Sequence, residues 1–124
     1  MDEQKAIKSI LNKARKDKSI LGVALFGSSL ERKGRYIDIC LFLDKKYPNN
    51  FMSKKKLSYY FSDKIDVQIF QQLPLYIRSR ILKKHKILLN KSPKKLYYVA
   101  VETIKEFELC KRMYSYFMEE TLNG

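Results

Sequence analysis

The chain begins with apolar residues at helical spacing and continues with unbroken apolar runs. Within residues 4–16, apolar side chains occupy the positions i, i+3, i+4 and i+7, namely Ile7, Ile10, Leu11 and Ala14. This spacing predicts an amphipathic helix. The runs 20–26 and 37–43 are apolar at nearly every position. Continuous runs of that length predict strands that are buried on both faces.

The middle of the chain predicts shorter elements. Residues 53–61 fit a short helix that Ser53 can cap. Residues 65–70 form a third apolar run, which predicts a strand. A helix is expected over 74–82, opened by its proline, and a short fourth strand over 86–89.

The last segment predicts one long helix over residues 93–121. Ser92 is a suitable N-cap, and Pro93 fits the first helical position. Apolar and aromatic residues then recur at steps of three and four: Tyr97, Ala100, Ile104, Phe107, Cys110, Tyr114, Phe117 and Thr121. Leu109, Met113 and Tyr116 widen this stripe. At 1.5 Å per residue the helix is ~43 Å long, so its stripe has two interpretations: the core-facing side of the helix, or a surface that docks on another chain.

Length and composition predict a single domain over 1–124, with its core in 4–90. A chain of 124 residues with 45% apolar residues builds one hydrophobic core. No apolar run approaches the ~20 residues that span a bilayer, and the N-terminus lacks the apolar stretch of a signal peptide. Cys40 and Cys110 lie in apolar patterns, which predicts reduced core thiols. We therefore expect a cytoplasmic protein without a membrane partner.

The formal net charge of +13 allows two interpretations. A basic field of that size favours nucleic acid, phosphate-rich ligands or an acidic partner. Alternatively, it reflects the lysine bias of an AT-rich or thermophile genome, with the charges solvated. Lysine far outnumbers arginine, and the lysine clusters lack the interleaved aromatics of a base-stacking surface.

Two aspartates within apolar runs are the candidate chemical groups. Residues two apart on a strand point the same way, so Asp38 shares a face with Tyr36, and Asp66 faces away from Ile65 and Val67. An acid between apolar neighbours is unfavourable to bury unless it is paired or bound to metal. If the two strands are neighbours, Asp38 and Asp66 face each other and form a shared cation site.

A glycine-serine turn precedes these acids. Gly27 permits close backbone approach, and Ser28 with Ser29 can open a short helix whose free amides point at an anion. A nucleoside triphosphate would place its phosphates there, with Mg²⁺ held by the carboxylates and a further carboxylate orienting the attacking hydroxyl. Tyr36 stands where the first acid of an Asp-x-Asp pair would lie, and a neutral phenol is a poor Mg²⁺ ligand.

These motifs resemble the minimal nucleotidyltransferases (MNT) of the DNA polymerase β superfamily. The resemblance covers roughly residues 4–90 and rests on GVALFGSS from Gly22, on Asp38, on IDVQIFQQLP from Ile65 and on ILKKHKILL from Ile81. It implies an α/β (α+β) fold, with a small mixed sheet flanked by helices and a long C-terminal helix. It also implies ATP as substrate and Mg²⁺ as cofactor.

The resemblance assigns roles to individual residues. Gly27 and Ser28 match the phosphate-binding turn, with Ser29 beside them, Asp38 matches the second acid of the pair and Asp66 the third. Many members are encoded beside a helical HEPN protein, often an RNase toxin, which they neutralise by adenylylating a tyrosine. The chain departs from the pattern at Tyr36, and Glu31 is a candidate replacement for the missing carboxylate.

Three functions stay open on the sequence. The first is an active nucleotidyltransferase that transfers AMP from ATP to a protein or small acceptor, as an antitoxin of the MNT type. The second is an inactive protein of the same fold that masks a HEPN-type partner, or associates with itself, through the C-terminal helix. The third is a basic module that binds nucleic acid, whose affinity would fall steeply with salt.

Overall fold

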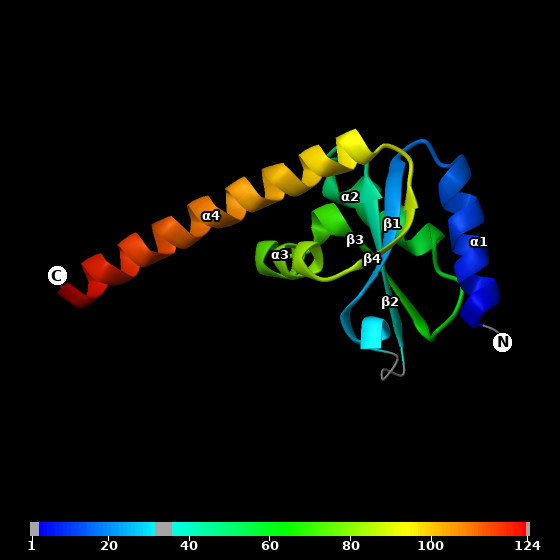
Figure 1. The fold of residues 1–124 in the computed structure, drawn as a ribbon, viewed down its shortest axis with the longest axis horizontal. Helices are drawn as coiled ribbons and strands as arrows, with labels where there is room; N and C mark the ends of the chain where they lie inside the picture. Colours follow the sequence, from blue (N-terminus) through cyan, green and yellow to red (C-terminus); the bar gives the residue numbers. More distant parts are fainter. Residues whose placement is uncertain (1–2, 32–35, 124) are drawn as a thin grey trace.

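The computed structural model describes residues 3–31 and 36–123, which form a sheet with helices on both faces (Figure 1). The helices are α1 (Glu3–Lys16), α2 (Asn49–Ser58), α3 (Leu75–Lys83) and α4 (Pro93–Asn123). The strands are β1 (Ile20–Phe26), β2 (Ile37–Leu43), β3 (Ile65–Ile69) and β4 (Lys86–Asn90). Two short 3₁₀ turns, η1 (Gly27–Glu31) and η2 (Phe70–Gln72), follow β1 and β3.

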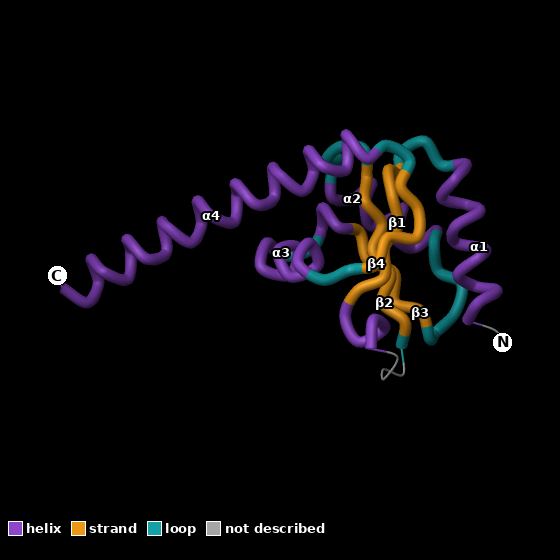
Figure 2. The backbone as a smooth tube through the Cα atoms, in the orientation of Figure 1, coloured by secondary structure: helices purple, strands orange, loops and turns teal. Residues whose placement is uncertain are grey.

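The sheet has the strand order β3-β2-β1-β4 and is mixed. Figure 2 shows its strands, in orange, between α1 and α3. β1 pairs antiparallel with both β2 and β4, whereas β2 and β3 run parallel. A parallel pair needs a crossover connection, and here α2 lies in the segment that joins β2 to β3. The expected small mixed sheet, flanked by helices and followed by a long C-terminal helix, is confirmed.

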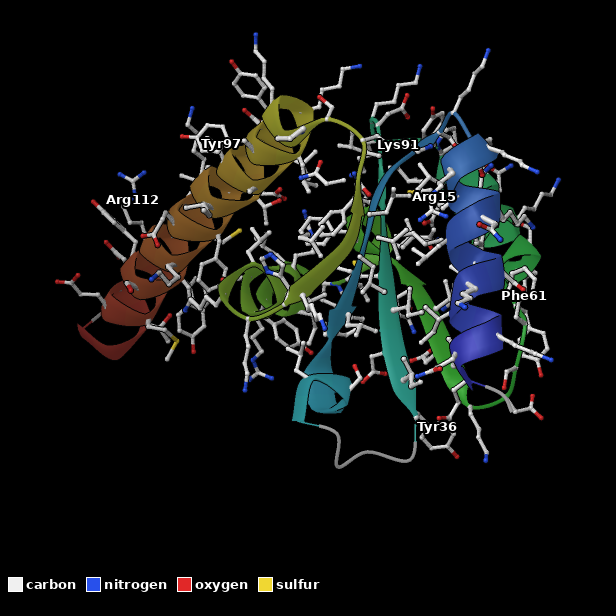
Figure 3. All side chains as sticks on the ribbon, turned by 45° about the vertical axis from the view of Figure 1, so that its right-hand side comes forward. Arg15, Tyr36, Phe61, Lys91, Tyr97 and Arg112 are labelled. Atoms are coloured by element: carbon white, nitrogen blue, oxygen red, sulfur yellow. The ribbon has the colours of Figure 1, made fainter. Side chains whose placement is uncertain are left out.

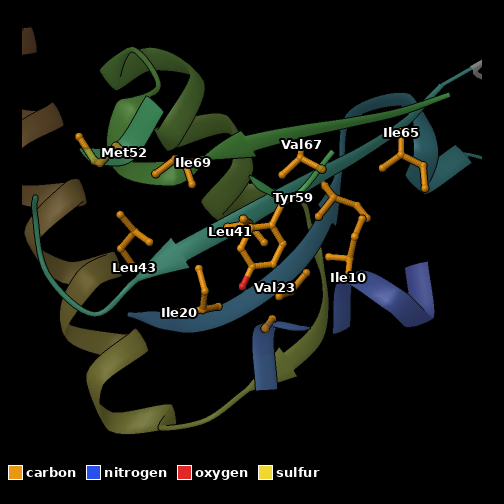
Figure 4. Packing of buried hydrophobic residues seen from close by; sticks show 12 residues of the cluster. Ile10, Ile20, Val23, Leu41, Leu43, Met52, Tyr59, Ile65, Val67 and Ile69 are labelled. Atoms are coloured by element: carbon orange, nitrogen blue, oxygen red, sulfur yellow. The ribbon is translucent and has the colours of Figure 1, made fainter. Parts of the chain in front are cut away.

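One face of the sheet packs against α1 and α2 (Figure 4). α1 contributes Ile10 and Ala14, both fully buried, as its apolar spacing predicted. Alternate residues of β2 (Ile39, Leu41 and Leu43) point into the same cluster. Each fully buried aliphatic side chain contributes about 1.5–3 kcal/mol, so this face supplies much of the stability of the fold.

The other face packs against α3 and the first turns of α4. Its cluster contains Cys40 and Phe42 from β2, Phe70 from η2 and Ile81 from α3. The rings of Phe42 and Phe70 lie 4.6 Å apart, centroid to centroid. Because Cys40 and Phe42 point to this face, Asp38, two residues earlier on the same strand, points to it as well.

α4 packs against the sheet and α3 over its first half and extends away from them over its second half (Figure 1). Its first turns cover the sheet, and Arg78 of α3 forms an ion pair with Glu106 at 3.5 Å. The outer half of α4, residues 108–123, extends beyond the other elements (Figure 1). Among the described residues, no helix is both long and apolar enough to cross a membrane.

Several predicted boundaries were wrong. The helix expected over 53–61 is α2, which begins at Asn49, directly after Pro48, and ends at Ser58. Ser53 therefore lies inside the helix, where its hydroxyl accepts a hydrogen bond from Gln72 instead of capping. The ring of Pro48 fixes its φ angle near the helical value, so it defines a helix start more strongly than a serine five residues later.

Three smaller predictions concern the end of the third strand, the two cysteines and the start of α4. The third strand ends at Ile69 because Phe70 begins η2. Cys40 is buried and free as expected, but Cys110 is exposed and is not a core thiol. The start of α4 is confirmed, since the backbone N–H of Lys95 donates to the Ser92 hydroxyl at 3.3 Å.

Candidate functional site

The two candidate aspartates lie directly opposite each other on neighbouring strands. Asp38 of β2 is the register partner of Asp66 of β3 in the parallel pair. On its other side, Asp38 is the register partner of Phe26, the last residue of β1. The sheet therefore brings together the two acids and the end of β1, which the sequence predicted on the condition that the strands of the two acids are neighbours.

Gly27 turns the chain tightly against Asp38. Its φ angle is +64°, in the left-handed region that favours glycine. A Cβ atom at this position would lie 2.6 Å from Oδ2 of Asp38, so a larger residue would collide with the carboxylate. The Ser29 hydroxyl donates to the Phe26 carbonyl and accepts from the backbone N–H of Asp38 at 3.4 Å. The turn is thus tied to the strand that carries the acid.

The remaining candidates from the turn region are only partly described. Ser28 lies in η1, but its side chain is outside the described residues, as is that of Glu31. The replacement of the missing acid by Glu31 therefore stays a prediction. Asp44 is engaged elsewhere, because its carboxylate accepts a hydrogen bond from the Tyr47 hydroxyl at 2.6 Å.

The two acids have different surroundings. Burial, together with the negative charge of Asp66, raises the pKa of Asp38. Asp66 is exposed, and both of its oxygens accept hydrogen bonds from the Gln68 side-chain amide at 3.1 and 3.2 Å. Gln68 in turn accepts a hydrogen bond from Lys56 of α2 at 3.0 Å. Lys56, Gln68 and Asp66 therefore form a chain of polar contacts from α2 to the site.

Two facing carboxylates fit one magnesium ion. Mg²⁺ is commonly held by one or two carboxylates, with water and substrate phosphates completing its shell. Burial and then the repulsion from Asp66 raise the pKa of Asp38, and a shared cation would relieve that repulsion. Within residues 3–31 and 36–123, no group of three or more acidic, histidine or cysteine side chains could hold a metal ion. The described residues therefore offer this pair of carboxylates without a third acidic, histidine or cysteine ligand.

A hollow of about 470 Å³ opens beside the acids, and we call it the Asp66 hollow. Its lining residues come from β2, β3, the end of α2 and the loop after α2: Tyr36, Asp38, Lys56, Leu57, Tyr60, Ser62, Asp63, Ile65, Asp66 and Val67. Its walls are thus aromatic and aliphatic, whereas its carboxylates and Lys56 supply charge. Tyr36 is 56% exposed.

A second hollow of about 390 Å³ lies on the β1 side of Asp38, and we call it the Gly27 hollow. It is lined by the end of β1, η1 and α3: Phe26, Gly27, Leu30, Ile77, Arg80, Ile81 and Lys84. Arg80 of α3 lies here and brings positive charge to this hollow. Arg78 does not, because its guanidinium bonds to the Leu73 carbonyl and to Glu106.

Sequence reasoning missed Gln68 and Lys56. Gln68 was part of the quoted strand motif, and its spacing of two from Asp66 places it on the same face. That spacing was the available signal. Lys56 belongs to a lysine cluster that gives no indication of which member reaches the sheet.

Comparison with known proteins places this geometry in context. The family model described as "Polymerase beta, Nucleotidyltransferase" matches residues 5–94. The chain is 34% identical over 73 residues to the "Putative protein adenylyltransferase MJ1547" of Methanocaldococcus jannaschii. That match covers 56% of this chain and about half, 55%, of the relative.

Solved structures share the fold at low sequence identity. One is the crystal structure of a toxin–antitoxin with AMP-PNP, with a TM-score of 0.66, 17% identity, and coverage of 95% of this chain and 97% of that chain. Another is the tri-AMPylated HEPN toxin of Shewanella oneidensis in complex with its MNT antitoxin, with a TM-score of 0.63 and 15% identity. It covers 94% of this chain and 92% of that chain.

Proposed function

This chain belongs to the polymerase β nucleotidyltransferase family, and from that membership we propose that it transfers AMP from ATP to a hydroxyl group on a protein, as the antitoxin partner of a HEPN-type helical toxin. The observation that carries this proposal is the register pairing of Asp38 with Asp66, beside the Gly27 turn. ATP and magnesium are abundant in the cytoplasm, where we expect the protein to act.

The Gly27 hollow suits the nucleotide. Its apolar wall, which includes Leu30 and Ile77, can contact the base and sugar. Arg80 lines the same hollow and supplies positive charge for the phosphates. The left-handed turn at Gly27 leaves the backbone open to close approach by an anion. The α-phosphate would then lie at Asp38, on the boundary between the two hollows.

The Asp66 hollow suits the acceptor. Asp38 lines the Asp66 hollow, and its register partner Phe26 lines the Gly27 hollow, so Asp38 lies between the two. An acceptor hydroxyl in the Asp66 hollow would approach the α-phosphate from the side of Asp66. Asp66 can then accept the hydroxyl proton, and Gln68 fixes the orientation of its carboxylate.

Asp38 and Asp66 would hold magnesium, which supplies charge stabilisation for the developing phosphoryl oxygens. Tyr36 has no carboxylate, although the family resemblance implies an acid at its position. We therefore expect slower transfer than in a site with the complete acidic set, because fewer ligands weaken binding of the ion.

Calorimetric titration of ATP tests this proposal directly. Wild type and Tyr36→Asp should be titrated with and without Mg²⁺, with Asp38→Asn as the matched control that removes a proposed ligand. We expect Mg²⁺-dependent binding by wild type, tighter binding by Tyr36→Asp and none of the Mg²⁺ dependence in Asp38→Asn. Equal binding by all three, or binding by none, would contradict a nucleotide site built on these acids.

A second function is favoured by the surface of α4. The outer half of α4 carries an exposed apolar surface, which is lined by Leu109, Arg112, Met113, Tyr116 and Phe117. The exposed fractions of Met113 and Tyr116 are 64% and 73%. Large exposed apolar patches mark interaction sites. We infer that this surface docks on the helical partner, so the chain can mask a toxin without transferring any nucleotide.

Co-purification separates the two functions. The protein encoded beside this chain should co-purify with wild type in the absence of ATP. Met113→Asp should break the complex, whereas Lys105→Asp, an exposed substitution on the same helix, should retain it. Loss of the complex in Asp38→Asn but not in Met113→Asp would refute docking through α4.

A further inference from the structure

Two tyrosines line the Asp66 hollow, and their hydroxyl groups are in different states. The Tyr60 hydroxyl donates a hydrogen bond to Asp63. This bond raises the pKa of Tyr60, which keeps the phenol protonated. Within residues 3–31 and 36–123, the Tyr36 hydroxyl has no hydrogen-bond partner. Among the described contacts of the two tyrosines, the Tyr60 oxygen is therefore engaged by an acid and the Tyr36 oxygen is not.

In two other tyrosines, a hydrogen bond to an adjacent acid raises the pKa of the phenol and so lowers its reactivity. The hydrogen bond from Tyr47 to Asp44 raises the pKa of Tyr47 to about 12. Burial, and then the bond to Asp17, raises the pKa of Tyr59 as well. A phenol is a weak nucleophile until it loses its proton, so these tyrosines are poor acceptors.

Tyr36 also has the right position. It directly precedes β2 and lies two residues from Asp38, and it lines the same hollow as Asp38 and Asp66. Figure 3 shows it at the end of the sheet where β2 begins, the end that also carries the Gly27 turn. At 56% exposure, its side chain has room to turn toward the acids.

We propose that Tyr36 is an internal acceptor, and that the protein transfers AMP from ATP to its own Tyr36 hydroxyl. This inference rests on the proposed transferase function. The Tyr36 oxygen forms a bond to the α-phosphorus, and the bond from that phosphorus to the bridging oxygen breaks. Pyrophosphate leaves with the electron pair, and the phenolic proton passes to the Asp66 carboxylate.

The product has a clear consequence for the site. Adenylylated Tyr36 carries a phosphodiester anion, and Lys56 in the same hollow supplies a positive charge beside it. The modified Tyr36 side chain would occupy the acceptor position in the Asp66 hollow and close it to other acceptors. The reaction therefore stops after one adenylyl group per chain, and the modified protein keeps only its docking function.

Mass spectrometry of the purified full chain tests the inference. After incubation with ATP and Mg²⁺, we expect one added adenylyl group, located on Tyr36 by peptide mapping. Tyr36→Phe should lose the modification. Tyr98→Phe is the matched control, because Tyr98 is 55% exposed, almost equal to Tyr36, but lies on α4 away from the hollow. It should be modified as wild type is.

A mixing experiment tests whether the transfer is internal. Wild type is incubated with a size-tagged Asp38→Asn copy, which retains Tyr36 but lacks a proposed ligand. We expect label on wild type alone, at a fractional rate independent of protein concentration. Label on the Asp38→Asn copy would overturn internal transfer, and label on Tyr60 or Tyr98 in place of Tyr36 would overturn the assignment.

The same samples separate this inference from the proposed function. The helical partner is added as a second acceptor, and ATP binding is followed by calorimetry. Adenylylation of the partner with Tyr36 unmodified would overturn the internal acceptor and leave the transferase standing. Absence of Mg²⁺-dependent ATP binding would overturn both. Circular dichroism and urea denaturation of Tyr36→Phe check that a lost modification is not due to a lost fold.

Discussion

Asp17, which precedes β1, and Asp38, which lies in β2, are both partly buried acids, yet their surroundings are opposite in character. Asp17, in the turn between α1 and β1, accepts hydrogen bonds from the Ser19 hydroxyl at 2.7 Å and from Lys55 and Tyr59, both at 2.9 Å. Asp38 faces another carboxylate, that of Asp66. Burial alone would raise both pKa values. The donors around Asp17 lower its pKa to about 2, whereas the pKa of Asp38 stays raised.

The ionised Asp17 carboxylate therefore stabilises the folded protein. The Asp38 and Asp66 carboxylates repel each other, and the fold holds them together despite this repulsion. Asp17 joins the α1–β1 turn to α2 through Lys55 and Tyr59, and the Tyr59 side chain is fully buried. The Asp38–Asp66 pair connects strands that already hydrogen-bond to each other. Like charges held together without a compensating cation favour a ligand that supplies one.

The largest expected effect is on stability at Asp17. Asp17→Ala should lower the free energy of unfolding by about 2–3 kcal/mol, because it leaves the buried Tyr59 hydroxyl without its acceptor and removes the partner of Lys55. Urea denaturation followed by circular dichroism measures the change.

Asp63→Ala is the matched control for this substitution. Asp63 also accepts a hydrogen bond from a tyrosine, Tyr60, but both residues are exposed. Its removal should change the free energy of unfolding by less than about 0.5 kcal/mol. Equal losses in the two variants would show that Asp17 is no more important to the fold than a surface acid.

The pH dependence of stability sharpens the same comparison. The pKa of Asp17 is about 2 in the folded protein, below its ordinary value of 3.8, so its ionised form stabilises the fold. That stabilisation is complete above about pH 4 and is lost as pH falls toward 2, in total about 1–2 kcal/mol. Urea denaturation at a series of pH values should show this loss in wild type, and Asp17→Asn should lack it. An equally steep acid loss in Asp17→Asn would assign the effect to other carboxylates.

The sheet could be predicted from the sequence because its strands are continuous apolar runs. The bounds of β1 and β2 agree with the predicted 20–26 and 37–43. α2 could not be placed as well, because its residues, NNFMSKKKLS, have almost no apolar periodicity and only Met52 is buried. The long helix α4 was predicted, but the point at which it leaves the body depends on contacts with α3 that a helical repeat does not encode.

The candidate site was predictable to a similar degree. Spacing placed Asp38 and Asp66 on defined faces of their strands. Their direct register is a tertiary property, so the sequence predicted it only on the condition that the two strands are neighbours. The link from Lys56 through Gln68 to Asp66 joins α2 to β3 and depends on how a lysine cluster folds over the sheet edge. The two hollows likewise arise from elements far apart in sequence.

A smaller effect of opposite sign is expected at Asp38. Its pKa is raised, so the ionised carboxylate destabilises the folded protein, and this destabilisation grows as pH rises above the ordinary value of 3.8. Asp38→Asn should therefore raise the free energy of unfolding of the metal-free protein at pH 7, by less than about 1 kcal/mol because solvent screens the pair. Thermal denaturation with and without Mg²⁺ measures both this gain and the loss of any Mg²⁺-dependent stabilisation. A lower melting temperature for metal-free Asp38→Asn would contradict the view that the Asp38–Asp66 pair destabilises the folded protein.

The smallest expected effect concerns Gln68, whose amide occupies both oxygens of Asp66. A cation at the pair competes with this amide for the same lone pairs, so Gln68→Ala should tighten Mg²⁺ binding two- to five-fold, which corresponds to about 0.4–1 kcal/mol for an exposed hydrogen bond to a carboxylate. Calorimetric titration with Mg²⁺ alone measures the change. Gln72→Ala is the control, because Gln72 donates to Asn49 and Ser53, which do not line the Asp66 hollow. Weaker Mg²⁺ binding in Gln68→Ala would instead show that Gln68 orients Asp66 for the ion, and that the link to Lys56 prepares the site for the cation rather than competing with it.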